Sequence, residues 1–220
     1  MNVDAYLASI IAAHEAAGSS PRDIQWHGHL LRVLPFVFSP ALAESSVFLV
    51  DYLLQQDVRD AEVIDAGCGT GILGIACALA GARRILAFDQ SPLAIDNTKQ
   101  NVQRLGLTKK FEFSVALDWE PRFAQCDIVV CNPPFVDASP STDWHRMFLD
   151  PHRQFLRAVL HNAWTSMAST GRLIVACADE VLPSLEVFEL IQKTGFRHIK
   201  RQEKANDSLL KVVVVSACKS

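Results

Sequence analysis

The distribution of hydrophobic and polar positions changes near residue 61. Before it, apolar positions favour helices over residues 2–17 and 41–56, and residues 24–40 between them favour extended structure. After it, short apolar runs alternate with segments that keep the period of an α-helix. Such alternation is typical of a mostly parallel sheet that helices cover on both faces.

The second part of the chain supplies seven strands. They are expected at residues 61–66, 84–88, 110–115, 127–131, 173–176, 196–201 and 211–217. Helices are expected between them at residues 71–80, 92–105, 149–168 and 182–194. The last two strands are joined without a helix, so we expect them to pair as an antiparallel hairpin. The pattern therefore predicts a Rossmann-like, doubly wound α/β fold with a seven-stranded sheet, mostly parallel, whose last strand is antiparallel.

The 220 residues suffice for one large domain with a small addition. We expect residues 36–220 to form the main domain and residues 1–35 a short helical and extended cap. Half of the residues are hydrophobic, which is typical of a well-packed globular fold. Residues 136–147, polar and interrupted by Pro140, are the expected mobile loop.

Charge and cysteine content narrow the class of protein. The net charge of −3 gives no general attraction to nucleic acid or to an anionic membrane. The six cysteines form no CxxC pair and lie mostly in apolar runs, so we expect buried free thiols in a reducing, cytoplasmic compartment. No signal peptide, membrane span or metal-binding histidine pattern is recognised, so no metal and no membrane partner is expected.

A glycine-rich loop follows the first strand of the main domain. Gly67, Gly69 and Gly71 allow a sharp turn and leave no side chains above the backbone, so a ligand can approach the start of the next helix. Asp89 ends the second strand, where its carboxylate can accept both hydroxyl groups of a ribose. Both features fall at the carboxyl edge of the sheet, which is the usual ligand side. The loop therefore predicts a site for a nucleoside-bearing cofactor.

Two cofactors are compatible with glycines at this spacing. Gly69, Gly71 and Gly74 also satisfy the dinucleotide pattern, with Asp89 at the expected distance, so a nicotinamide-dependent oxidoreductase is an alternative. Asp65 at the end of the first strand favours the other cofactor, S-adenosylmethionine. Its carboxylate can hold the loop through backbone amides or receive a cationic amino-acid tail, whereas it would repel a pyrophosphate.

The segment Asn132-Pro133-Pro134-Phe135 follows the fourth strand. Its two prolines fix the backbone and remove two N–H donors, so Asn132 and the Pro133 carbonyl can present oxygen acceptors to both hydrogens of an amino group. Phe135 can lie over a flat amide or a base. An amide or aminopurine nitrogen is a poor nucleophile, and its alkylation depends on positioning. The segment therefore predicts methyl transfer to nitrogen.

One further pair is compatible with cofactor binding. Asp118 and Trp119 follow the third strand and could reach an adenine, with Asp118 accepting from its amino group. A solvent-facing turn with a half-buried tryptophan is the alternative.

Together these residues resemble the class I S-adenosylmethionine-dependent methyltransferases over about residues 36–218. The loop resembles the cofactor loop of the family, and Asn132-Pro133-Pro134-Phe135 resembles the tetrapeptide of enzymes that methylate glutamine side chains of release factors or amino groups of bases. Residues 37–40 with Glu44 and Ser45 resemble the stretch that lines the pocket in the release-factor and small methyltransferase-domain groups. The glutamine enzymes usually carry tyrosine at the position of Phe135 and a longer N-terminal domain.

The resemblance implies an N-methyltransferase that uses S-adenosylmethionine. The favoured acceptor is a glutamine side-chain amide of a protein, followed by a base amine in rRNA or tRNA. A binding module that kept the fold without activity is a further alternative. The residues expected to hold the acceptor are Asn132, Pro133 and Phe135, and those expected to bind the cofactor are Asp65, Gly67, Cys68, Gly69, Gly71, Asp89, Gln90, Asp118 and Trp119.

Overall fold

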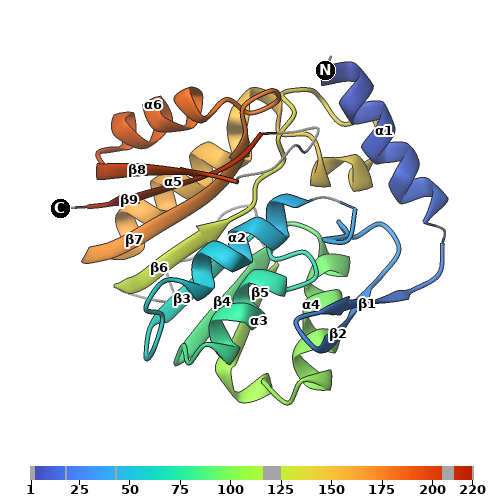
Figure 1. Cartoon of the computed structure of the whole chain (residues 1–220), viewed down its shortest axis with the longest axis horizontal. Helices are drawn as coiled ribbons and strands as arrows, with labels where there is room; N and C mark the ends of the chain where they lie inside the picture. Colours follow the sequence, from blue (N-terminus) through green and yellow to red (C-terminus); the bar gives the residue numbers. More distant parts are fainter. Residues whose placement is uncertain (1–2, 18, 43, 116–124, 205–210, 220) are drawn as a thin grey trace.

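A seven-stranded sheet forms the centre of the protein in a computed structural model that describes residues 3–17, 19–42, 44–115, 125–204 and 211–219 (Figure 1). The strand order is β5-β4-β3-β6-β7-β9-β8. Strand β9 runs antiparallel to both of its neighbours, and the other neighbouring pairs are parallel. The predicted Rossmann-like sheet with an antiparallel last strand is therefore confirmed. The strands are β3 (Glu62–Ala66), β4 (Arg84–Asp89), β5 (Phe111–Val115), β6 (Cys126–Cys131), β7 (Met167–Ala178), β8 (Arg197–Glu203) and β9 (Val212–Cys218).

Helices cover both faces of this sheet. Helices α2 (Glu44–Leu54) and α3 (Ile72–Leu79) pack against each other on one face, and α5 (Gln154–Ser166) and α6 (Ser184–Thr194) pack together on the opposite face (Figure 1). Helix α4 (Pro92–Arg104) lies against β4 and β5 and is followed by a single 3-10 turn, η1 (Thr108–Lys110). In the described ranges, no helix combines the length and hydrophobicity required of a bilayer-crossing segment.

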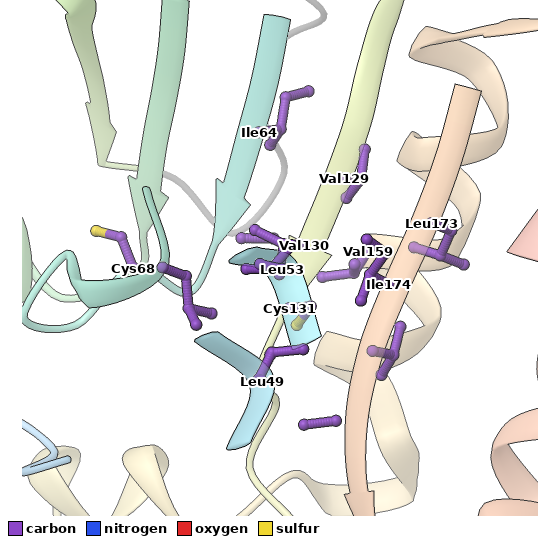
Figure 2. Packing of buried hydrophobic residues seen from close by; sticks show 14 of the residues in the cluster. Leu49, Leu53, Ile64, Cys68, Val129, Val130, Cys131, Val159, Leu173 and Ile174 are labelled. Carbon is purple, nitrogen blue, oxygen red and sulfur yellow. The ribbon is translucent and has the colours of Figure 1, made fainter. Parts of the chain in front are cut away.

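The core lies on both sides of the central strands. Figure 2 shows Leu49 and Leu53 of α2 beside β6, and Val159 of α5 beside β7. These side chains are at most 1% exposed. Burying each of them contributes about 1.5–3 kcal/mol to folding. The hydrophobic effect therefore holds α2 against the sheet, where it contacts β7 and β9, and its first turn reaches Asn132.

The N-terminal region forms a helix and a hairpin. Helix α1 (Val3–Ala16) precedes strands β1 (Arg22–Trp26) and β2 (His29–Val33), which pair antiparallel. Two buried asparagines of α4 fasten the hairpin: Asn97 donates to the Arg32 carbonyl and accepts from the Leu34 N–H, and Asn101 accepts from the Arg32 N–H. Asn101 also donates to the Thr70 carbonyl, so it joins the hairpin to the glycine-rich loop.

The segment before α5 differs from the sequence prediction of a helix over residues 149–168. Two 3-10 turns, η2 (Asp143–Met147) and η3 (Pro151–Arg153), precede a helix that begins only at Gln154. The buried Asp150 carboxylate accepts hydrogen bonds from the Phe155 and Leu156 N–H groups, at 2.7 and 3.0 Å. This carboxylate satisfies two free N–H groups of the first helical turn, so the helix starts there.

Candidate active site

The glycine loop turns sharply between β3 and α3. Gly67, Gly69 and Gly71 have φ values of 75°, 54° and 81°, in the left-handed region that glycine adopts most easily. The N–H groups of Gly67 and Cys68 donate to the Phe88 carbonyl at 2.9 and 3.0 Å, which fixes the loop against β4. A Cβ atom on Gly69 would meet nothing within 4 Å, so the space above this residue is open. The loop therefore leaves its backbone accessible to a ligand.

Asp65 lies beneath the loop and is fully buried. Its Oδ2 accepts from the Gly74 N–H at 2.9 Å, whereas its Oδ1 has no hydrogen-bond partner among the described residues. A Cβ atom on Gly74 would lie 3.0 Å from Oδ2 and 2.9 Å from Ile85, so close packing explains this glycine. Burial raises the pKa of Asp65 to about 7. The backbone amide that Asp65 contacts belongs to the first turn of α3, directly after the loop.

Replacement of Asp65 by asparagine should change how stability depends on pH. Because the folded-state pKa lies above the unfolded value, the native protein binds more protons between about pH 4 and pH 7, and wild-type stability falls over that range. Asp65→Asn can still accept from Gly74 and does not titrate. We expect the free energy of unfolding of the variant minus that of wild type to increase by up to about 4 kcal/mol from pH 4 to pH 8.

Urea unfolding of the ligand-free protein at several pH values measures this difference. Asp60→Asn is the control, since Asp60 is exposed. For this variant, the difference in free energy of unfolding from wild type should stay the same at every pH. A parallel pH dependence of wild type and Asp65→Asn would contradict the prediction.

Asp89 stands at the end of β4, facing the loop. Its Oδ2 accepts from the Gly69 N–H at 3.0 Å and its Oδ1 from the Ser91 N–H at 2.9 Å. Burial raises its pKa, although these backbone N–H groups favour the charged form. Each carboxylate oxygen can accept a second hydrogen bond, so the fixed Asp89 side chain retains acceptors for two hydroxyl groups.

A cavity of about 740 Å³ opens above the loop at the carboxyl edge of the sheet. Its volume is in the range of sites that hold a cofactor or a drug-sized ligand. Tyr6 of α1, residues 36–38, Trp144 and Phe148 are among its lining residues, and the rings of Phe36 and Phe38 contact those of Trp144 and Phe148. The sequence-predicted residues on its wall are Gly67, Cys68, Gly69, Asp89, Gln90, Asn132, Pro133 and Phe135.

The other predicted site residues do not lie on this wall. Gly71 is the residue before α3, and Thr98 of α4 packs directly against it. Asp65 lies beneath the loop, and Asp118 and Trp119 lie outside the described residues. Cys68 Sγ lies 3.3 Å from the Thr98 hydroxyl oxygen, and burial raises the pKa of Cys68 well above its usual value, so it is a neutral thiol.

Asn132 presents its side-chain oxygen without a partner. Its Nδ2 donates to the Ser46 hydroxyl at 2.8 Å and to the Ser45 hydroxyl at 3.2 Å. Its Oδ1 is buried and has no hydrogen-bond partner among the described residues. A buried acceptor without a partner is rare in folded proteins and indicates a place for a ligand donor. In the described residues, the Pro133 carbonyl likewise accepts no hydrogen bond.

The loop after Phe135 is held by Arg153, which the sequence analysis did not single out. This buried guanidinium donates to the Phe135 carbonyl at 2.8 Å and pairs with the Glu186 carboxylate. Phe135 itself is 7% exposed and its ring lies in the cavity wall. No local pattern around Arg153 indicates this role, because its partners come from the segment after β6 and from α6.

An exposed aromatic side chain marks the entrance. Phe36 is 58% exposed and has a φ of 60°, which is uncommon for a bulky residue. Its ring lies 5.9 Å from that of Trp144, and both residues line the cavity. Strained backbone of this kind concentrates at functional sites. No group of three or more metal-binding side chains gathers in the described part of the chain.

Comparison with known proteins gives consistent matches to methyltransferases. The family model described as ribosomal protein L11 methyltransferase matches residues 44–133. The ribosomal protein L11 methyltransferase of Psychrobacter sp. is 43% identical over 79 residues, which cover 36% of this chain and 26% of that protein. A Methanocaldococcus jannaschii protein with the provisional name protein N5-glutamine methyltransferase is 34% identical over 116 residues, 53% of this chain and 56% of that protein. The chain thus spans between a quarter and just over half of these relatives.

Solved structures share the whole fold. A Thermus thermophilus 16S rRNA N2 G1207 methyltransferase, solved with AdoMet and guanosine, superposes with a TM-score of 0.68 at 21% identity. The match covers 91% of this chain and 50% of that one. The glycine loop and Asn132 both lie within the matched residues 44–133. The chain therefore shares the fold of these methyltransferases and is similar in sequence to methyltransferases over residues 44–133.

Proposed function

We propose that this protein transfers a methyl group from S-adenosylmethionine to the nitrogen of a planar amino group, with a glutamine side-chain amide of a protein as the favoured acceptor. The observation that carries the proposal is the unpartnered Oδ1 of Asn132 beside the cavity. An amino group that donates there would satisfy the only side-chain hydrogen-bonding capacity that Asn132 has left.

The residues on the wall fit the cofactor. Asp89 offers two oxygens to the ribose hydroxyls, and the open backbone at Gly69 leaves room above the loop. The Asp89 carboxylate is an acidic group on the wall, and Asp65 lies beneath the loop. When bound, the cofactor supplies an electrophilic methyl group on a sulfonium.

Asn132 and Pro133 would act on the acceptor. Two oxygens that accept from both N–H bonds hold the nitrogen with its lone pair directed out of the plane of those bonds. The one proton that leaves the nitrogen as the new N–C bond forms is released to water. Phe135 supplies an apolar surface for the flat group. The surrounding side chains of Phe38, Phe148 and Tyr6 limit the access of water.

The charge distribution favours a protein over RNA as acceptor. In the basic segment 193–204, Arg201 pairs with Asp179 and Glu203, Lys204 pairs with Glu44, and Lys193 pairs with Glu189. These pairs reduce the charge available to phosphates, which dominate RNA affinity. A base amine in RNA is the second candidate, because Phe36 and Trp144 at the entrance suit stacking on a base.

Cofactor choice is tested by thermal melting. We expect S-adenosylhomocysteine, at 100 times its Kd, to stabilise the protein by about 2.7 kcal/mol and to raise Tm by about 5–10 °C. NAD at the same concentration should leave Tm unchanged. A shift with NAD and none with S-adenosylhomocysteine would instead support the oxidoreductase alternative.

The acceptor is tested with labelled cofactor. The protein is incubated with methyl-labelled S-adenosylmethionine and an extract of source cells that lack it, and portions are then treated with protease or ribonuclease. Label that ribonuclease leaves and protease removes supports a protein acceptor, and hydrolysis should then yield N5-methylglutamine. Label that only ribonuclease removes would identify RNA, and transfer to neither would refute the proposed function.

A further inference from the structure

Two serines of α2 contact the amide that is proposed to hold the acceptor. Ser45 and Ser46 lie in the first turn of the helix and are each 4% exposed. Their hydroxyl oxygens accept the hydrogen bonds from Asn132 Nδ2 at 3.2 and 2.8 Å. Among the described residues, neither hydroxyl makes another side-chain hydrogen bond. Helix capping does not explain these two serines, because both lie inside the helix and their hydroxyl groups contact Asn132.

We propose that Ser45 and Ser46 are positioning residues that orient the Asn132 amide, so that its carbonyl oxygen and not its NH2 group faces the acceptor nitrogen. The proposal rests on the proposed function of Asn132. The proposal adds a cause for the amide orientation, namely two hydroxyl groups of α2. Ser46 of this helix is 86 residues from Asn132 in the sequence.

The number of donors and acceptors supports this orientation. The Asn132 amide has two N–H hydrogens, and the two serine oxygens provide one acceptor for each. A reversed amide could accept from the serine hydroxyls, but it would direct both of its N–H groups at the N–H groups of the acceptor, which cannot accept from them. In the observed orientation the serine oxygens accept from both N–H groups, and the amide oxygen remains for the acceptor.

The serines are held on a rigid support. Leu49 and Leu53 of the same helix are at most 1% exposed and pack beside Val130 and Cys131 of β6, which leads directly into Asn132 (Figure 2). The helix and the strand therefore fix both ends of the two hydrogen bonds. Functional groups supported by packed helices and strands keep their geometry better than groups on loops.

The test uses the full chain with Ser45→Ala and Ser46→Ala combined. We expect kcat for methyl transfer to the label-accepting fraction of the extract to fall about 10- to 100-fold, because the amide can rotate away from its productive orientation. The Tm increase produced by S-adenosylhomocysteine should be unchanged. Ser184→Ala is the matched control, since Ser184 also begins a helix, is buried and hydrogen-bonds to another side chain, that of Arg201.

A spectroscopic readout separates orientation from stability. In protein labelled with ¹⁵N-asparagine, the Asn132 side-chain NH2 resonances, assigned by their loss in Asn132→Asp, should be protected from solvent exchange in wild type and exposed in the double variant. Wild-type kcat in the double variant, or unprotected resonances in wild type, would overturn the proposal. If wild-type protein transfers no methyl group, the proposed function is refuted. Protection of the Asn132 side-chain resonances in the same protein would still support the amide orientation.

Discussion

Replacing Asn132 with alanine is expected to lower kcat for methyl transfer by about 100- to 1000-fold, the loss typical when one preorganised polar group is removed from a reacting centre. The variant removes the buried Oδ1 that has no partner in the described part of the chain. The Pro133 carbonyl remains, but a single acceptor no longer fixes the plane of the amino group. Binding of S-adenosylhomocysteine should be retained, since Asp89 and the loop are untouched.

The measurement is the rate of label transfer at saturating cofactor, with the melting shift by S-adenosylhomocysteine as the check of folding and cofactor binding. Asn162→Ala is the matched control, because Asn162 lies on α5 and is absent from the cavity wall. If Asn132→Ala retains more than half of the wild-type rate, the role assigned to Asn132 is wrong.

Replacing Gly71 with alanine is expected to destabilise the protein by about 2–4 kcal/mol. An alanine at the observed φ of 81° costs about 1–2 kcal/mol. Its Cβ would also lie 2.6 Å from Thr98 Cγ2. Thr98 is fully buried and its hydroxyl donates to the Gly69 carbonyl at 2.9 Å, so it cannot move away without breaking the loop. Such overpacking adds about 1–3 kcal/mol, partly offset by the lower chain entropy of alanine in the unfolded state.

Gly106→Ala is the matched control for this variant. Gly106 has a similar φ of 68°, but a Cβ atom there would meet nothing within 4 Å. It should therefore lose only about 1 kcal/mol, which is the conformational part. Urea unfolding of both variants isolates the contribution of the contact with Thr98. Equal losses in the two variants would show that this contact is unimportant.

The Asn132 site combines parts that are distant in the chain. Asn132 directly follows strand β6, the first turn of α2 supplies its two hydroxyl partners, and Arg153 before α5 fixes the loop that follows Phe135. A substitution in any of the three elements can therefore change the same acceptor geometry. The proposed roles of Asn132 and the two serines predict that their losses of activity are not additive, because each acts through one amide.

The sequence by itself determined the order of strands and helices in the main domain, because hydrophobic periodicity is a local property of the chain. It also located the loop of Gly67, Gly69 and Gly71 and the segment that begins at Asn132, because close approach and a rigid backbone require particular residues at fixed spacing. From these positions alone, the carboxyl edge of a parallel sheet could be predicted as the ligand side.

Only the tertiary structure decided which side chains meet across long separations. Asn97 and Asn101 hold the N-terminal hairpin through backbone groups more than 60 residues away, and Ser45 and Ser46 reach Asn132 over a comparable distance. It also decided that α5 begins at Gln154, because the buried Asp150 carboxylate caps it. Serine, asparagine and aspartate occur in many loops and helix ends without such partners. Their roles follow from desolvation, which obliges each buried polar group to find a partner wherever the folded chain provides one.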